Sequence, residues 1–490
     1  MPEQKDLELL IHGHTPILQI ETHEEKRALD LLVRIATQNV IPLFKWSVTE
    51  GLRRVDIDLG VQRHNAEPRD VLGHIKSSDV DGIYVLLDFD PYIQEPVNQR
   101  YIKEIAMQFE GGRNKLVFIS HKVDMPPGLA KRVARFELRL PDARALEHII
   151  RDEAGRWQKE SGKRVATDAD TLQRLMRNLS GLTFNDARRL VRNVIVDDGA
   201  ITEEDLPEVM RAKYQLLNRD DVLSFEFETT RFSEVGGMRT LKRWLQQREK
   251  IFHGLIDQPG IDTPRGVLLL GVQGCGKSLA AKAISGILKL PLLRFDFGAL
   301  YDNYIGESEK NQLESLNTAE VMAPCVMWID EIEKGIASGN DDGTSRRILG
   351  SLLTWLAENR SSVFIVATAN NIDDLPPELI RKGRLDEIFF VDLPKQDIRK
   401  QIFSIHMDKR QVDPSAIDLE TLAAASEGFS GSEIEQAVVS AIYSSYGSDR
   451  PMTTQSLLKE IRATRPLSVV MDAQIQQLKH WAESRTVPVD

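Results

Sequence analysis

The sequence predicts an α/β protein in which mostly parallel sheets are covered by helices, and three observations indicate this class. Short apolar runs rich in β-branched residues alternate with helical patterns; they read TPILQIE, GIYVLLD and KLVFISH in the first half and RGVLLLG, PCVMWID and SVFIVAT in the second. A glycine-rich loop connects one of these runs directly to a helical pattern. Beyond Pro394 the pattern is helical and poor in strands. The alternation is typical of layered α/β domains, followed here by a helical subdomain.

Length and composition bound the protein further. A chain of 490 residues is long enough for about three folding units. Its 63 Lys and Arg against 74 Asp and Glu give a net charge of −11, which argues against nucleic acid as a partner. Two cysteines, Cys275 and Cys325, predict a reducing compartment, and no export signal or membrane-spanning run is visible. We therefore expect a cytoplasmic protein without a membrane anchor.

The sharpest motif is the loop GVQGCGKS, which follows the apolar run GVLLL and precedes the helix-forming run LAAKAISGIL. It satisfies G-x-x-x-x-G-K-[ST], the pattern of a loop whose backbone N–H groups surround phosphate oxygens at a helix N-terminus. Lys277 would reach the β- and γ-phosphates, and the Ser278 hydroxyl would ligate Mg²⁺. We expect nucleotide contacts from Gly271, Val272, Gln273, Gly274, Cys275, Gly276, Lys277, Ser278 and Leu279.

A second strand, within CVMWIDEIEK, ends in the acidic pair Asp330 and Glu331. Asp330 is expected to hold the metal through water, together with Ser278, and Glu331 to polarise the attacking water. An acidic pair that merely begins a surface helix is the alternative, but the position of the pair after the phosphate loop favours catalysis. Loop and pair together predict the hydrolysis of ATP or GTP.

From Phe232 to Tyr443 the chain resembles the AAA+ ATPases, because motifs of that family occur in its order: FSEVGG, GVQGCGKS, YIGESEKN, APCVMWIDEIEK, VFIVATANN, LPPELIRKGRLDE and GFSGSEIEQ. A closer resemblance, through WIDEIEK, VATANN, RKGRLDEIFF and TWLAEN, is to an uncharacterised AAA+ family encoded in chloroplast and cyanobacterial genomes, and it extends over most of the chain. The resemblance implies a P-loop NTPase domain with three αβα layers and a C-terminal helical lid.

The resemblance also implies catalytic roles for three residues. Asn370 matches the polar sensor that holds the water or the γ-phosphate, and the adjacent Asn371 is the alternative. Arg381 and Arg384 match arginines that such proteins insert into the nucleotide site of the neighbouring subunit. Solvated arginines at a helix end are the alternative. If both arginines act in this way, an isolated subunit should hydrolyse ATP poorly.

Two further segments match positions that contact nucleotide in the family. Val235, Gly236 and Gly237 match the segment that packs on the adenine, and this match favours ATP over GTP as the substrate. The lid would contribute Gly431 and Ser432. Here the sequence departs from the family, since Ser-Glu stands where many members have Ala-Asp.

Cys275 is another departure, because Thr is usual at this position of the loop. A thiol at a helix N-terminus could have a lowered pKa and act as a redox brake on phosphate binding. The alternative is a small residue that is simply tolerated there.

Tyr304, Ile305 and Gly306 match the loop that AAA+ unfoldases direct into a central pore. An exposed aromatic side chain on such a loop can grip an extended polypeptide through apolar contact. A tyrosine packed within its own subunit is the alternative, because membership of a fold does not establish threading.

The two halves of the chain show an internal repeat. Segments of the first half match segments of the second in the same order: residues 117–132 with 363–382, 136–150 with 389–403, and 180–195 with 427–442. This order predicts a duplicated module, and chance similarity between two α/β domains is the alternative.

The first repeat lacks the residues needed for catalysis. After TPILQIE stands THEEKRAL, which has no Gly and has two glutamates that would repel a triphosphate. Asp88 is matched with the metal-binding aspartate of the second half, but Phe89 and His121 replace Glu331 and Asn370. We expect a catalytically inactive AAA+-like domain for assembly or partner recognition; an independent α/β adaptor is the alternative.

The predicted organisation is a degenerate AAA+-like domain without a phosphate loop at 1–215, an ATPase core at 216–395, a helical lid at 396–465 and a tail at 466–490. The predicted function is hydrolysis of ATP with Mg²⁺ by a homo-oligomer, expected to be a hexameric ring, that remodels or unfolds a protein client. An ATP-dependent assembly switch or scaffold that regulates a partner without threading it is the alternative.

Overall fold

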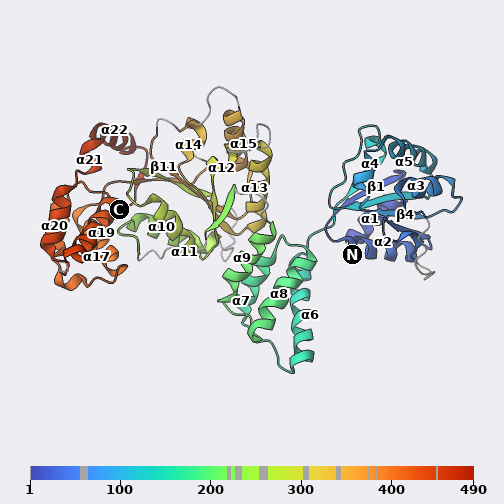
Figure 1. Cartoon of the computed structure of the whole chain (residues 1–490), viewed down its shortest axis with the longest axis horizontal. Helices are drawn as coiled ribbons and strands as arrows, with labels where there is room; N and C mark the ends of the chain where they lie inside the picture. The colour runs from blue at the N-terminus through green and yellow to red at the C-terminus, as the bar shows by residue number, and fades with distance from the viewer. Residues whose placement is uncertain are drawn as a thin grey trace. The chain divides into compact units, whose positions relative to one another are not determined.

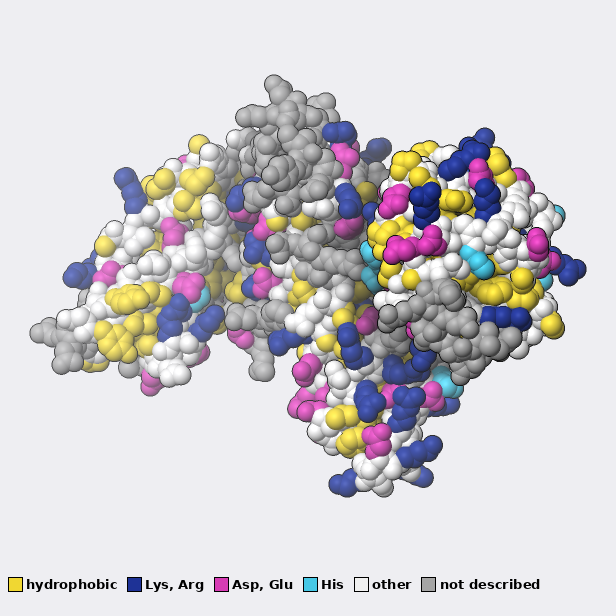
Figure 2. All heavy atoms as spheres, turned by 45° about the vertical axis from the view of Figure 1, so that its right-hand side comes forward, with side chains coloured by type: hydrophobic (Ala, Val, Ile, Leu, Met, Phe, Trp, Pro, Cys, Tyr) yellow, Lys and Arg dark blue, Asp and Glu magenta, His cyan; other side chains and the backbone are white. Residues whose placement is uncertain are grey.

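The computed structural model describes residues 2–55, 65–217, 222–226, 234–252, 263–301, 308–337, 344–372, 375–381, 383–448 and 451–490 (Figure 1). It divides into two compact units, one of Met1–Ala145 with Thr183–Arg189 and one of Leu146–Leu182 with Leu190–Asp490. On the face drawn in Figure 2, basic side chains lie among acidic ones. None of the described helices is long and apolar enough to cross a membrane.

The first unit contains a sheet with helices on both faces. Its described strands pair in the order β3-β2-β4-β5-β1-β6, all parallel except for β3 against β2. The strands are β1 (Ile17–Glu21), β2 (Leu43–Ser47), β3 (Gly51–Arg54), β4 (Ile83–Leu87), β5 (Lys115–Ser120) and β6 (Val133–Phe136). The helices are α1 (Pro2–His12), α2 (Glu25–Gln38), α3 (Pro68–Ser77), α4 (Asp90–Ile93) and α5 (Pro96–Phe109).

Apolar spacing explains why these segments form layers. All five residues of β4 are buried, as expected of a parallel strand that is covered on both faces. In α2 the buried positions are Ala28, Leu31, Leu32, Ile35 and Ala36, which lie on one face of a helix. This face packs on one side of the sheet, and α3 and α5 supply the apolar cluster on the other side.

The second unit contains a larger sheet. Its described strands pair in the order β13-β12-β8-β11-β10-β9-β7, all parallel except for β7 against β9. The strands are β7 (Leu223–Glu226), β8 (Gly266–Gly271), β9 (Leu292–Phe295), β10 (Cys325–Ile329), β11 (Val363–Ala369), β12 (Glu387–Val391) and β13 (Val487–Pro488). The helices around it are α10 (Arg239–Phe252), α11 (Lys277–Leu288), α12 (Phe297–Tyr301), α13 (Ser308–Met322), α14 (Ile332–Ala337), α15 (Thr344–Glu358) and α16 (Pro377–Ile380).

The two sheets repeat one topology, in agreement with the repeat that the sequence predicts. The order β6-β1-β5-β4-β2 of the first sheet corresponds to β12-β8-β11-β10-β9 of the second. Each sheet also carries an antiparallel strand beside the last strand of this series. The matched sequence segments fall on corresponding elements, since β5 pairs with β1 as β11 pairs with β8.

The strand registers correct one sequence match in the first unit. Leu87 lies opposite Ile119 across β4 and β5, and Ile329 lies opposite Ala367 across β10 and β11. If His121 corresponds to Asn370, Asp88 must correspond to Glu331 rather than to Asp330. Asp88 and Glu331 both have a φ of 47°, unusual for a residue with a side chain. The match of Asp88 with the metal-binding aspartate is therefore wrong by one residue.

Helices α6 to α9 follow the first sheet, and helices α17 to α20 follow the second. Their bounds are α6 (Ala143–Ser161), α7 (Ala169–Leu179), α8 (Phe184–Asp198), α9 (Asp205–Leu217), α17 (Gln396–Asp408), α18 (Leu419–Ala425), α19 (Gly431–Ser448) and α20 (Thr454–Ala463). Met210 and Tyr214 of α9 join the apolar core of the second sheet. The buried Lys213 donates to the Ser180 carbonyl at 2.5 Å.

Residues after α20 form ordered elements, α21 (Leu467–Val470), α22 (Asp472–Ala482) and strand β13. Leu467 N donates to the Glu433 carboxylate of α19 at 2.7 Å, and β13 pairs with β12. This segment thus contacts both the helices α17–α20 and the sheet.

Candidate active site

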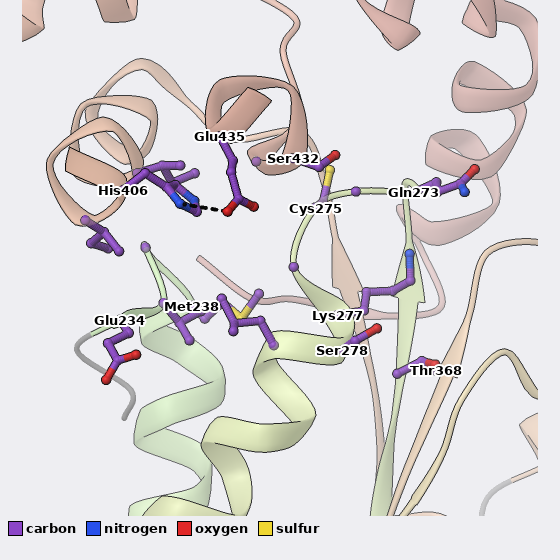
Figure 3. A pocket seen from close by; sticks show the side chains of 18 of the residues that line it. Glu234, Met238, Gln273, Cys275, Lys277, Ser278, Thr368, His406, Ser432 and Glu435 are labelled. Atoms are coloured by element: carbon purple, nitrogen blue, oxygen red, sulfur yellow. Dashed lines mark ion pairs between the residues drawn. The ribbon is translucent and has the colours of Figure 1, made fainter. Parts of the chain in front are cut away.

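A cavity of about 440 Å³ lies at the carboxyl ends of β8, β10 and β11, where parallel α/β sheets commonly bind ligands (Figure 3). Its wall combines the loop after β8, the acidic pair after β10, the end of β11, the segment before α10 and parts of α17 and α19. The lining residues are Glu234, Val235, Gly236, Met238, Gln273, Gly274, Cys275, Gly276, Lys277, Ser278, Leu279, Asp330, Glu331, Thr368, Asn370, Ile402, Ile405, His406, Lys409, Gly431, Ser432 and Glu435.

The loop after β8 has the backbone that its glycines require. Gly274 and Gly276 have φ values of 77° and 88°, a region that side chains disfavour. Gly274 also lies so close to the lid that an added Cβ would stand 2.3 Å from Ser432 Oγ. Helix α11 begins immediately after Gly276, and its free N–H groups favour an anion at this end.

Lys277 is 7% exposed, and its ammonium group donates to the carbonyls of Gly271 at 2.8 Å and Val272 at 2.9 Å. Burial lowers the pKa of Lys277 to about 8. Gly271 ends β8 and Val272 begins the loop after it, so the backbone at the start of the loop surrounds the ammonium group of Lys277. A phosphate placed beside this ammonium would favour its charged form.

The acidic pair is held by a residue that the sequence did not single out. Thr368, at the end of β11, donates its hydroxyl to Asp330 Oδ1 at 2.7 Å and accepts the Glu331 N–H at 3.0 Å. Asp330 Oδ1 also lies 3.5 Å from the Ser278 hydroxyl, so the two expected metal ligands face each other. A hydroxyl and a carboxylate are ligand types that suit Mg²⁺, which usually keeps several waters and binds substrate phosphates as well. These residues therefore fit a magnesium–nucleotide complex.

Asn370 contacts the acidic cluster at two points. Its amide Nδ2 donates to Glu331 Oε1 at 2.9 Å, and its backbone N–H donates to Glu333 Oε1 at 2.9 Å. Glu333 is buried, and this burial raises its pKa. Asn371, the alternative to Asn370, lines a neighbouring cavity of about 290 Å³ rather than this one.

The opposite end of the cavity lies between the segment before α10 and the helices α17 and α19. Val235 and Gly236 line it as the sequence predicts, whereas Gly237 does not and lies against Asp490. Ser432 lines the cavity and donates its N–H to the Gly274 carbonyl at 3.1 Å. This contact joins the lid to the loop.

Sequence reasoning missed the side chains of α17 that reach this end, above all Ile402 and His406. His406 Nδ1 lies 3.5 Å from Glu435 Oε1 of α19, and burial lowers the pKa of His406 (Figure 3). A half-buried His on an amphipathic helix carries no signal in a single sequence, so only the geometry reveals it.

The environment of the Cys275 thiol does not support the hypothesis of a redox brake. Burial raises the pKa of its thiol to about 12, so the expected lowering of that pKa is wrong. Burial outweighs the nearby charge of Lys277 and the backbone contact with Gly431, both of which lower this pKa. The smaller claim, that a small residue is tolerated in the loop, remains.

Arg381 and Arg384 do not line this cavity, and Arg384 Nη1 is buried with no hydrogen-bond partner among the described residues. The segment that follows them is tied to the start of β8. Asp386 Oδ2 accepts the N–H groups of Arg265 at 2.7 Å and Gly266 at 2.9 Å. The predicted pore residues Tyr304, Ile305 and Gly306 lie outside the described residues.

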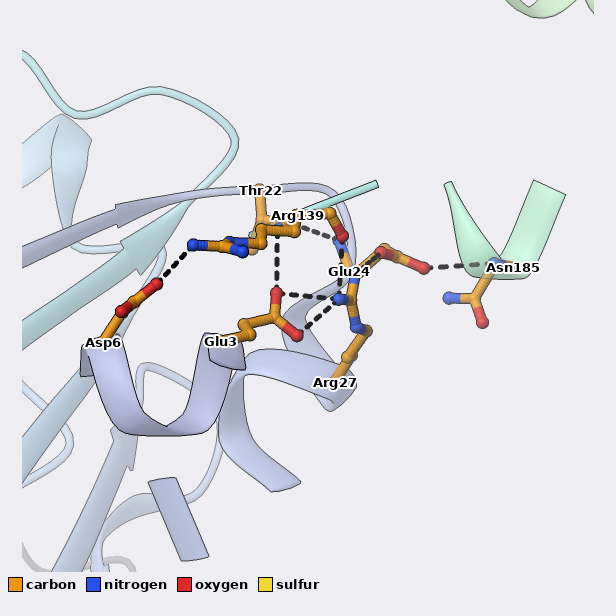
Figure 4. A network of polar contacts seen from close by, with 7 residues as sticks. All are labelled: Glu3, Asp6, Thr22, Glu24, Arg27, Arg139 and Asn185. Atoms are coloured by element: carbon orange, nitrogen blue, oxygen red, sulfur yellow. Dashed lines mark hydrogen bonds and ion pairs between the residues drawn. The ribbon is translucent and has the colours of Figure 1, made fainter. Parts of the chain in front are cut away.

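The corresponding position in the first unit is filled by a carboxylate (Figure 4). Glu24, directly before α2, is 4% exposed and accepts Arg27 Nη1 at 2.8 Å and Asn185 N at 3.1 Å. Arg27 also binds both oxygens of Glu3 at 2.8 Å. The Asn185–Glu24 contact parallels the bond from Ser432 to Gly274, but with an anionic side chain in place of a phosphate loop.

The chain matches four family descriptions in succession: "SpoVK-like AAA ATPase, N-terminal domain" at residues 3–138, "SpoVK-like AAA ATPase, second domain" at 144–220, "ATPase family associated with various cellular activities (AAA)" at 267–393 and "AAA+ lid domain" at 416–460. The successive matches cover the first sheet with α6–α9, strands β8–β12 of the second sheet, and α18, α19 and most of α20, whereas β7, β13 and α17 lie outside them.

Similar proteins extend over the whole chain. The uncharacterised AAA domain-containing protein ycf46 of Guillardia theta is 34% identical over 98% of this chain and 95% of its own length. The protein of the same name from Pyropia yezoensis is 34% identical over 98% and 97%. The proteasome-activating nucleotidase of Aeropyrum pernix is 32% identical over 48% of this chain and 60% of its own length.

Proposed function

Because this chain belongs to the family of AAA ATPases that includes the ycf46 proteins, we propose that it is a homo-oligomeric machine that uses Mg²⁺ and ATP to remodel a protein partner. The observation that carries the proposal is the bond from Asn370 to Glu331 in a cavity shared with Lys277. A base, the amide that orients it and a phosphate-binding lysine are the parts that phosphoryl transfer to water requires.

Each proposed role follows from a contact. Glu331 accepts a proton from, and orients, the attacking water, while Asn370 keeps its carboxylate in position. Lys277 exchanges its carbonyl contacts for phosphate oxygens, and the loop N–H groups hold the remaining charge. Ser278 and Asp330 would hold the metal, which would supply positive charge to the bound phosphates. Val235, Gly236 and the lid residues Gly431 and Ser432 enclose the base and ribose.

The proposal of an oligomer rests on two arginines that do not line the cavity of the chain that carries them. Arg381 and Arg384 lie outside the cavity, so we propose that they complete the site of a neighbouring subunit in a hexameric ring. An arginine supplied in this way can raise the rate by about 10³ to 10⁵. Tyr304, Ile305 and Gly306 would face the pore of that ring. The proposal includes the division of the chain into four parts after residues 215, 395 and 465. It also includes a cytoplasmic location, a reducing compartment in which the two free cysteines would stay reduced.

The test of the ATPase assembly is the rate of ATP hydrolysis per subunit against protein concentration. We expect the rate to rise steeply as subunits assemble, and the Glu331→Gln variant in ATP to have the mass of a closed oligomer. Lys277→Ala, which should bind no ATP, is the control and should stay small. A monomer with a rate that does not depend on concentration would exclude the role of Arg381 and Arg384 in a neighbouring site.

A switch or scaffold that needs no threading is the second candidate, since the similarity to the proteasome-activating nucleotidase covers only 48% of this chain. Tyr304→Ala separates the two. Loss of client processing with normal ATP turnover supports threading, whereas an unchanged effect on the client supports the switch.

A further inference from the structure

Residues Val487–Asp490 lie against the segment that lines the base end of the cavity. Strand β13 pairs with β12, and Val489 N donates to the Phe390 carbonyl at 3.2 Å. Val489 is 6% exposed and belongs to the same apolar cluster as Val235, Met238 and Leu241. The chain is thus anchored at the edge of the sheet before it reaches the nucleotide segment.

Two hydrogen bonds connect these residues to the start of α10. The Thr240 N–H donates to the Val489 carbonyl at 2.9 Å, and the Arg239 N–H donates to Asp490 Oδ1 at 3.1 Å. The first N–H groups of a helix have no partner within it, so a carboxylate at this place acts as a cap. Asp490 therefore stabilises the point at which α10 begins, directly after residues 235–238.

Gly237 shows how closely the two segments approach. A Cβ added to Gly237 would lie 2.6 Å from Asp490 Oδ2, and its φ of 71° is itself unfavourable for a side chain. On the other side, the lid helix α17 holds the same segment. Gln401 Oε1 accepts the Gly237 N–H at 3.3 Å, and Asp397 pairs with Arg239 Nη2 at 3.0 Å.

We propose that Val487–Asp490 form an outer wall of the base end of the nucleotide site, and that Asp490 is a positioning residue for adenine recognition. Asp490 does not line the main cavity and acts through Gly237 and Arg239, which fix the backbone of Val235 and Gly236. A base recognised by backbone atoms is selected only if that backbone is held in one conformation. The inference rests on the proposed binding of ATP in this cavity.

The experiment compares equilibrium binding of ATP, GTP and inorganic tripolyphosphate to the full chain and to Asp490→Ala. We expect the variant to bind ATP about tenfold more weakly and to discriminate less between ATP and GTP, because a cap with a charged acceptor is lost. Tripolyphosphate, which contacts only the phosphate loop, should bind with unchanged affinity, which also shows that the loop is intact. Asp490→Asn keeps an oxygen acceptor for Arg239 and should recover much of the ATP affinity.

Asp472→Ala is the matched control, because Asp472 is an exposed carboxylate of the neighbouring α22 that contacts Gln476. It should bind all three probes as the unaltered chain does. Equal ATP affinity of Asp490→Ala and the unaltered chain would overturn the inference, and so would a parallel loss of ATP and tripolyphosphate. Lys277→Ala reports on the premise: if it binds ATP as well as the unaltered chain does, the proposed nucleotide site itself is wrong.

Discussion

Thr368 combines two tasks in one hydroxyl group. It is 1% exposed at the end of β11, donates to Asp330 and accepts the N–H of Glu331. The hydroxyl therefore sets the direction of the metal-binding carboxylate and the backbone of the proposed base at once.

We expect Thr368→Val to lower kcat by about 5- to 100-fold, because it leaves the Glu331 N–H unpaired and removes a bond to Asp330 at nearly constant volume. KM for ATP should change much less, since the phosphate loop is untouched. Steady-state kinetics measure both. Thr354→Val is the control, because Thr354 is exposed on α15 and, within the part of the chain that the structure describes, its Oγ1 bonds the Gly350 carbonyl of its own helix. A normal kcat for Thr368→Val would contradict this role.

The lysine of the phosphate loop predicts a pH dependence of ATP binding. The pKa of Lys277 is about 8 in the structure, and a bound triphosphate should raise it because the anion favours the ammonium form. Affinity should then be constant below about pH 8 and fall above it, by up to about tenfold per pH unit, since binding must take up a proton. Equilibrium titrations with ATP across this range measure the effect.

Lys277→Arg is the matching control, because its guanidinium stays charged throughout this range. Its affinity should be lower but nearly independent of pH. If the unaltered chain bound ATP with the same affinity below and above pH 8, deprotonation of Lys277 would not affect ATP binding and the prediction would be wrong.

The sequence predicted many of the residues that line this cavity, because they occur in short local motifs. Asp330 and Glu331 directly follow β10, Asn370 directly follows β11, and Lys277 begins the helix after the loop of β8. Parallel strands bring their carboxyl ends to one edge of the sheet. Thr368 and His406 are different. A Thr inside a buried strand and a His on a lid helix look like ordinary packing residues, and only the distances to Asp330 and Glu435 distinguish them.

Among the elements, strand β8 has side-chain contacts at both ends: Lys277 donates to the carbonyl of Gly271, and Asp386 accepts the N–H of Gly266. Its carboxyl end leads into the phosphate loop at Gly271, and its amino end is held by the carboxylate of Asp386. Arg265 Nη1 also donates to the Gly383 carbonyl, next to Arg384. The segment that carries the proposed trans-acting arginines is thus fixed to the strand that carries the subunit's own nucleotide loop.

Asp386→Ala should therefore loosen Arg384 without changing the variant's own cavity. We expect at least a tenfold loss of ATPase rate with nearly normal ATP affinity. Mixing the variant with Glu331→Gln subunits, which cannot hydrolyse ATP but keep their arginines in place, should restore part of the rate. Asp408→Ala, an exposed carboxylate of α17, should behave like the unaltered chain. No recovery in the mixture would mean that Asp386 acts within its own subunit.

Elements with a local signal were predictable, whereas those defined by distant contacts were not. Strands β1, β4, β5, β8, β10 and β11 and helix α11 follow from apolar runs and the glycine loop, whereas no such run was identified for β2, β3, β7 or β9. Strand β13 has a proline and only two residues, and it exists because β12 offers an edge. The packing of α9 on the second sheet likewise depends on Met210 and Tyr214 meeting residues far along the chain.

For the whole molecule the repeated topology predicts one nucleotide per chain rather than two. The first sheet has the strand order of the second, but Glu24 occupies the place of the phosphate loop and Leu87 that of the metal-binding aspartate. Equilibrium binding of ATP to the full chain should reach about one equivalent per chain, and Lys277→Ala should bind none. A second equivalent, or binding that survives in Lys277→Ala, would show that the first unit retains a site.

Because the anion of the first unit is the side chain of Glu24, we expect the geometry of this unit not to vary with the ATP concentration in the cell. When ATP is depleted, the cavity beside Lys277 empties, but Glu24 stays bonded to Arg27 and Asn185. A surface of the first unit would then be presented to a partner equally in starved and in well-supplied cells. Capture of that partner and its subsequent processing would thus respond to different signals within one polypeptide.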